Sequence, residues 1–113
     1  MKKIFLLSVI TAFLLSCNKL TEKNIVGTWN PVEFKVDGAS QPIFPNTYIE
    51  FTESGSVLYY TAGVLDSYDF YSIQDNGSVL SIDGTNYDVE KKGKTMTLTY
   101  TGSNTEELTL EKQ

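Results

Sequence analysis

The stretch TMTLTYTGSNTEELTLE, residues 95–111, alternates between apolar and polar side chains on both sides of a Gly-Ser-Asn turn. Met96, Leu98 and Tyr100 fall on one face of the first half, and the alternation resumes after the turn. A period of two with a single apolar face indicates strands that have one side in a core and the other in water. Antiparallel sheets have this pattern, so the stretch predicts an antiparallel hairpin.

Turn-forming residues recur along the chain from residue 25 onward, at the spacing of roughly 8–12 residues that is typical of all-β sandwiches and barrels. The turn signals are Asp37-Gly38, Ser54-Gly55, Gly63, Asp75-Asn76-Gly77, Asp83-Gly84, Lys92-Gly93-Lys94 and Gly102-Ser103-Asn104. Seven connections predict eight strands, and short hairpins favour a meander over Greek-key crossings. Because a meander hides its edges best by closing, we predict an all-β fold, a small eight-stranded antiparallel up-and-down barrel.

Two central segments, 56–62 and 69–73, carry apolar side chains on both faces. One interpretation is that the long loop 37–46, which contains Ile43 and Phe44 between two prolines, or a partner covers the outer face. The other is that tyrosines there simply tolerate exposure, as amphipathic side chains often do.

The first residues have the features of an export signal. Met1-Lys2-Lys3 precedes an apolar run from Ile4 to Leu15, which ends at Ser16-Cys17. A positive start, a short apolar run and a small residue before the cleavage point define a secretory signal. The run is about 18 Å long as a helix, too short for a hydrocarbon core of about 30 Å. We predict a detached helix over residues 2–16 that contributes nothing to function.

The end of this signal resembles the lipobox of bacterial lipoproteins, in which the cysteine is acylated and becomes the first mature residue. The matching residues are Leu14-Leu15-Ser16-Cys17, and Cys17 is the single cysteine of the chain. The alternative is an ordinary signal followed by a free thiol. We predict a signal peptide over 1–16, a lipidated Cys17 with a polar tether over 17–24, and a barrel over 25–113. The resemblance, with Asn18 after the cysteine, implies export and anchoring to the cell envelope at the outer membrane.

A second resemblance lies at the start of the predicted barrel. Ile25-Val26-Gly27-Thr28-Trp29-Asn30 is similar to the Gly-x-Trp signature of lipocalins and the lipocalin-like domains of envelope lipoproteins. The resemblance implies an eight-stranded up-and-down barrel in which Trp29 plugs the closed end and Gly27 allows close backbone approach. Classical lipocalins place an arginine over this tryptophan. This chain has no arginine, and Lys112 stands where a weaker cation–π contact is expected.

The resemblance also implies function, because lipocalin-like barrels usually bind a small hydrophobic molecule in the barrel mouth. The candidate ligand-binding residues are Trp29, Phe34, Phe51, Tyr59, Phe70, Tyr87, Met96, Leu98 and Tyr100. The alternative for these side chains is a filled core, since an eight-stranded barrel holds either side chains or one small ligand.

The amino-acid composition argues against several classes of function. The 113 residues include 9 lysines, 14 acidic residues, no histidine and no arginine, for a formal charge of −5. Without histidine there is no Ser/His or Cys/His pair and no His-ligated zinc. Few cations make a poor nucleic-acid binder. We therefore expect a monomer that is not an enzyme, with no cofactor, no metal and no nucleic-acid partner.

An alternative function is protein interaction, because small β-barrel envelope lipoproteins include inhibitors of lysozyme. Removal of residues 1–16 leaves seven lysines and a formal charge of −7, which suits a cationic protein partner. The side chains expected to project outward are Glu50, Glu53, Asp88, Glu90, Glu106, Glu107 and Glu111. In this alternative the barrel is packed and its acidic surface carries the function.

Overall fold

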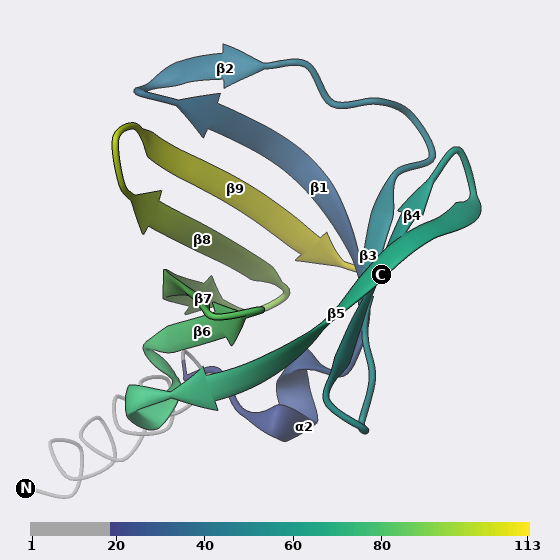
Figure 1. The fold of residues 1–113 in the computed structure, drawn as a ribbon, viewed down its shortest axis with the longest axis vertical. Helices are drawn as coiled ribbons and strands as arrows, with labels where there is room; N and C mark the ends of the chain where they lie inside the picture. Colours follow the sequence, from purple (N-terminus) through teal and green to yellow (C-terminus); the bar gives the residue numbers. More distant parts are fainter. Residues whose placement is uncertain (1–18) are drawn as a thin grey trace, which may run out of the picture.

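The first barrel strand, β1 (Gly27–Val36), pairs with the last, β9 (Thr105–Lys112), and this pairing closes the sheet into a barrel (Figure 1). The computed structural model describes residues 19–113. The predicted helix over residues 2–16 and the predicted lipidation site Cys17 lie outside the described residues. Every pairing in the sheet is antiparallel.

The strands follow one another around the ring in chain order, apart from one short addition. The remaining barrel strands are β3 (Tyr48–Phe51), β4 (Ser56–Thr61), β5 (Val64–Gln74), β6 (Val79–Ile82), β7 (Thr85–Lys92) and β8 (Thr95–Thr101). The predicted eight-stranded up-and-down barrel is confirmed. A ninth strand, β2 (Ala39–Gln41), folds back on the end of β1 within the segment expected to be a loop. The fold-back occurs because Asp37 and Gly38 both adopt positive φ, as a two-residue hairpin turn requires.

One end of the barrel is solidly packed, and we call this end the floor. Six of its inward-facing side chains are at most 1% exposed. They are Trp29, Phe51, Val57, Leu80, Met96 and Leu110. A short helix, α2 (Glu22–Ile25), lies beneath them, and its Ile25 is fully buried. The floor therefore combines strand residues with the segment that precedes the first strand.

The segment before β1 is docked, whereas the sequence predicts a polar tether there. Leu20 is only 2% exposed, and Thr21 caps α2. The Thr21 hydroxyl accepts from the Asn24 amide at 3.1 Å, and the Asn24 side chain accepts from the Thr21 amide at 2.8 Å. This reciprocal pair satisfies two helix-end donors that would otherwise be free. Burial of Leu20 and Ile25 in the floor is the physical reason why residues 20–25 pack.

The outer face of the β4–β5 hairpin stays uncovered by the rest of the described chain. Leu65, Tyr68 and Phe70 are 50–65% exposed. The loop that was one candidate cover does not shield them, since its own Phe44 is 72% exposed. The loop therefore does not cover this face, and the choice between cover by a partner and tolerated exposure stays a prediction.

Candidate functional site

We call the end of the barrel opposite the floor the mouth. Its inward-facing side chains are partly exposed, although the strands that carry them also carry the buried floor residues. They are Phe34, Tyr59, Asp69, Tyr87, Tyr100, Glu106 and Leu108. The inward-facing side chains are therefore more exposed at the mouth than the six buried side chains of the floor.

The strand register places these residues on the inner face, because directly paired residues share one face of a sheet. Leu108 lies opposite Phe34 on one side and opposite the buried Leu98 on the other. Glu106 lies opposite Tyr100 in the same ladder.

The pairing of strands also places residues of the other half of the ring on the inner face. Tyr87 lies opposite the buried Leu80, and Asp69 lies opposite the buried Val57. Tyr59 pairs with Ile49, which also pairs with Trp29. Side chains from both halves of the ring therefore point into the same interior.

Four of the sequence-predicted site residues belong to the packed interior instead of the mouth. Trp29, Phe51, Met96 and Leu98 are 0–4% exposed. The Trp29 indole N–H donates to the Ile25 carbonyl at 2.8 Å, so its one polar atom is satisfied within the floor. These four side chains fill space and leave none beside them for a ligand.

The roles expected of Trp29, Gly27 and Lys112 in the floor are confirmed. The Lys112 ammonium lies 5.6 Å from the centroid of the Trp29 ring, and it donates to the Asn24 carbonyl at 2.8 Å. A Cβ on Gly27, whose φ is +136°, would lie 2.8 Å from the Lys112 side chain. The lysine therefore substitutes for the arginine of classical lipocalins, and the glycine leaves the room that it needs.

Four other predicted residues, Phe34, Tyr59, Tyr87 and Tyr100, do line the mouth. The rings of Tyr87 and Tyr100 lie 6.0 Å apart, tilted by 55°. Burial raises the pKa of the Tyr87 hydroxyl, and the negative charge of Glu106 raises it further. The hydroxyl is therefore held protonated and can donate a hydrogen bond.

Phe70 is the one predicted site residue that lies outside the barrel. It is 65% exposed and packs edge-on against Tyr68, with ring centroids 5.9 Å apart. Because neighbours along a strand alternate between faces, the inward position of Asp69 forces Phe70 outward. The expected interior placement of Phe70 is therefore corrected.

The sequence reasoning missed two inward carboxylates. Asp69 lies close to the Tyr59 hydroxyl, and burial, followed by the interaction with this carboxylate, raises the pKa of Tyr59. Glu106 was expected to project outward, but its partners Tyr100 and Val36 place it on the inner face. The alternation that puts Leu108 and Leu110 on the inner face also puts Glu106 there, so this signal was present in the sequence but was not used.

The comparison with protein families agrees with this architecture. A family model described as a lipocalin-like domain matches residues 25–112. The chain belongs to this lipocalin-like family. The match begins at the buried Ile25 and ends at Lys112, the residue over Trp29. A comparison of the chain with curated proteins finds no match.

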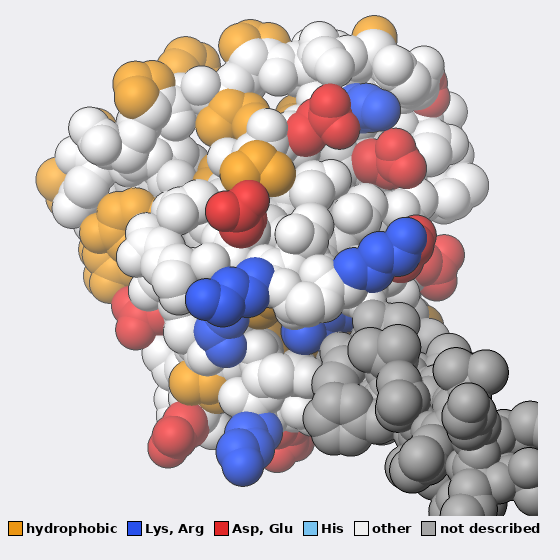
Figure 2. All heavy atoms as spheres, turned by 180° about the vertical axis from the view of Figure 1, so that it is seen from behind, with side chains coloured by type: hydrophobic (Ala, Val, Ile, Leu, Met, Phe, Trp, Pro, Cys, Tyr) orange, Lys and Arg blue, Asp and Glu red, His pale blue; other side chains and the backbone are white. Residues whose placement is uncertain are grey.

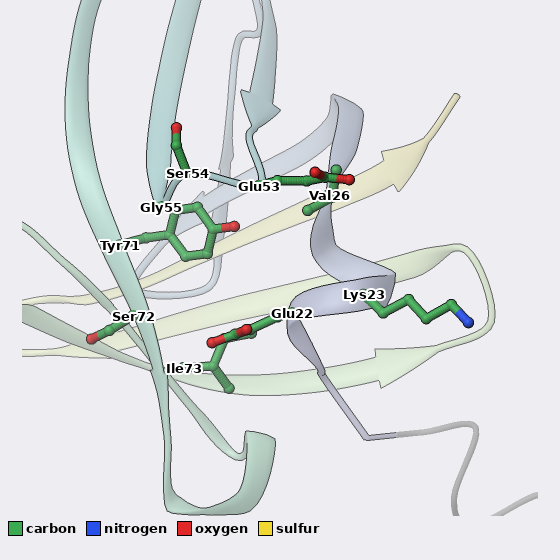
Figure 3. A pocket seen from close by; sticks show the side chains of 9 residues that line it. All are labelled: Glu22, Lys23, Val26, Glu53, Ser54, Gly55, Tyr71, Ser72 and Ile73. Atoms are coloured by element: carbon green, nitrogen blue, oxygen red, sulfur yellow. The ribbon is translucent and has the colours of Figure 1, made fainter.

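The lipocalin-like domain also has a groove at the floor end of the barrel, between α2 and the inner face of β5 (Figure 3). It has a volume of about 620 Å³ and is lined by Glu22, Lys23, Val26, Glu53, Ser54, Gly55, Tyr71, Ser72 and Ile73. The Tyr71 hydroxyl donates to the Thr52 carbonyl at 2.7 Å, and burial, then the charge of Glu22, raises its pKa. Lys23 extends away from Tyr71 and Ile73 in Figure 3. The polar groups of the groove include the carboxylates of Glu22 and Glu53 and the Tyr71 hydroxyl, which already donates to Thr52.

Three further observations concern the surface charge, metal ligands and membrane-spanning helices of the domain. On the face seen in Figure 2, lysine and acidic side chains are interspersed. Residues 19–113 contain no group of three or more His, Cys, Asp or Glu side chains arranged to hold a metal ion. Within the same residues, no helix has both the length and the apolar content needed to cross a membrane.

Proposed function

We propose that this lipocalin-like domain binds a small, largely apolar molecule in the mouth of its barrel and catalyses no reaction on it. The observation that carries the proposal is the contrast between the two ends of one interior. Six inward-facing residues of the floor are 0–1% exposed, whereas the inward aromatic residues of the mouth remain partly exposed. Ligand sites typically combine apolar walls with a few placed polar groups, and the tyrosine hydroxyls supply such groups here.

The proposal includes export and a lipid anchor at Cys17. It is supported by the lipobox-like residues before Cys17 and by the docking of Leu20 on the floor. Three residues span at most about 11 Å, so an acyl group on Cys17 would keep the floor near a membrane. The mouth would then face away from the lipid, toward its ligand. Metabolic labelling with a fatty acid tests the anchor, and Cys17→Ser is expected to abolish the label.

Titration of the domain with 1-decanol, a neutral apolar probe, tests binding in the mouth. Binding is expected by calorimetry and by a change in tyrosine fluorescence, and it is expected to persist at high salt because it is apolar. Leu108→Trp fills the mouth and should abolish binding. Val32→Trp adds the same ring to an outward position of β1 that is 51% exposed, and it should leave binding intact. Absence of decanol binding, or equal binding by both variants, contradicts the proposal.

A second candidate function is recognition of a cationic protein, as in envelope inhibitors of lysozyme. The uncovered apolar face of β5 favours it, since the exposed Tyr68–Phe70 pair resembles the aromatic anchors of protein interfaces. Binding of lysozyme to the domain tests it. If this function holds, binding is salt-sensitive and weakens in Phe70→Ser while decanol binding is unchanged.

A further inference from the structure

The charges inside the barrel are separated, with carboxylates in the mouth and ammonium groups in the floor. Asp69 and Glu106 face the mouth. Among residues 19–113, the lysines on inner faces are Lys91 and Lys112, which pair with the buried Met96 and Trp29 of the floor. Any ligand head group in the mouth therefore meets negative charge first.

The floor lysines are not available to a ligand. Lys91 is 7% exposed, and its ammonium donates to the Gly93 carbonyl at 2.6 Å. Lys112 is engaged with the Asn24 carbonyl and the Trp29 ring. The fully buried Met96 and Leu110 are their packed neighbours in the floor. An anionic head group thus finds no accessible cation in the described interior.

The carboxylates lie beside aromatic rings that face the same space. Tyr100 lies opposite Glu106 and beside the Tyr87 ring. Asp69 lies close to the Tyr59 hydroxyl, and it lies close enough to Tyr87 for its negative charge to raise the pKa of that hydroxyl as well. Aromatic faces attract cations, and a carboxylate at a partly desolvated site strengthens this attraction.

We infer that the mouth selects ligands that carry a positive charge on an apolar body, such as alkylammonium or arylammonium compounds, over fatty acids and other anionic amphiphiles. This inference rests on the proposed function, since it names the class of ligand for the same mouth. The ammonium group would lie between the carboxylates of Asp69 and Glu106, against the faces of Tyr87 and Tyr100. The apolar body would contact Phe34 and Leu108.

Three probes with the same ten-carbon chain test the inference by calorimetry on the domain. They are decyltrimethylammonium, 1-decanol and decanoate, used below their micelle concentrations. We expect the cation to bind about tenfold more tightly than the alcohol, which corresponds to a difference of about 1.4 kcal/mol. Decanoate is expected to bind more weakly than the alcohol.

Isosteric variants test which carboxylates attract the cationic probe. Asp69→Asn and Glu106→Gln should each weaken binding of the cation about threefold to tenfold while leaving 1-decanol nearly unchanged. Glu107→Gln is the matched control, because it removes the same charge from the adjacent outward position, opposite Lys35. It should leave the affinity for the cation unchanged.

The outcomes separate the two proposals. If the alcohol binds and decanoate binds as tightly as the cation, the charge selectivity is wrong and the proposed function stands. Equal losses in Glu106→Gln and Glu107→Gln also overturn the selectivity, because they show attraction to the whole acidic surface. If none of the three probes binds, the proposed function fails and the inference fails with it.

Discussion

Gly77 is the position at which the docking of the N-terminal segment can be tested most sharply. It follows two other residues with positive φ in the turn between β5 and β6, its own φ is +89°, and it is buried. A Cβ there would collide with the Leu20 carbonyl oxygen and lie 3.0 Å from the Leu20 nitrogen. Because these are backbone atoms, no side-chain rotation relieves the collision. Gly77→Ala must therefore displace the segment that carries Leu20.

The expected cost has two parts. An alanine in the left-handed region is strained by about 1–2 kcal/mol. Displacement of Leu20 from the floor exposes a leucine side chain, which costs about 1.5–3 kcal/mol. Gly84→Ala is the matched control, since its φ is +81° and no atom lies within 4 Å of the added Cβ. We therefore expect Gly77→Ala to destabilise the domain by about 1.5–3 kcal/mol more than Gly84→Ala does.

Urea denaturation followed by the fluorescence of Trp29 measures both variants, because this fully buried ring reports on the floor. A Leu20→Ala background completes the test. There the leucine contribution is already lost, so the additional cost of Gly77→Ala should fall to that of Gly84→Ala. Equal effects of the two glycine variants in the natural background would refute the reasoning, since docking of Leu20 would then contribute nothing.

Three further predictions concern the cap, the mouth and the outer face. Thr21→Ala removes one half of the reciprocal cap of α2 and should cost about 1 kcal/mol in the same denaturation assay. Because the folded pKa of Tyr59 is raised, its contribution to stability is complete below pH ~10 and is lost as the pH rises further. Tyr59→Phe should therefore flatten the loss of unfolding free energy above pH ~10, measured by urea denaturation at each pH. Phe70→Ser should change stability by less than about 0.5 kcal/mol, because the ring is exposed.

The sequence predicted the strands well where alternation was clean, as in β8 and β9. There one face is apolar and the other polar, so the period fixes both the strand and its inner face. In β5 the pattern was ambiguous, because Phe70 and Tyr71 are both aromatic. The choice between the two faces depends on the partner strand, where Val57 is buried opposite Asp69. Residue identities within β5 carry no information on that pairing.

The docking of residues 20–25 is a second feature that could not be predicted from the sequence. Leu20 is a single apolar residue in a polar stretch, which is the pattern of a tether. Its burial depends on Gly77, more than fifty residues away, which lacks the Cβ that would block its backbone. Such a non-local fit leaves no periodic signal. The Gly27–Trp29 signature, in contrast, predicted the floor correctly because its partner Lys112 could be placed from the family resemblance.

The two inward carboxylates bear most directly on what the mouth can hold. Asp69 and Glu106 break the rule that inward positions are apolar, and such departures are expected at functional sites. Both remain partly exposed, and water solvates their charge. An anionic ligand that filled the mouth would remove this water and add repulsion between like charges, which is costly for a carboxylate. A cation removes the same water but supplies the opposite charge, so we infer that these two carboxylates discriminate between ligands by their charge.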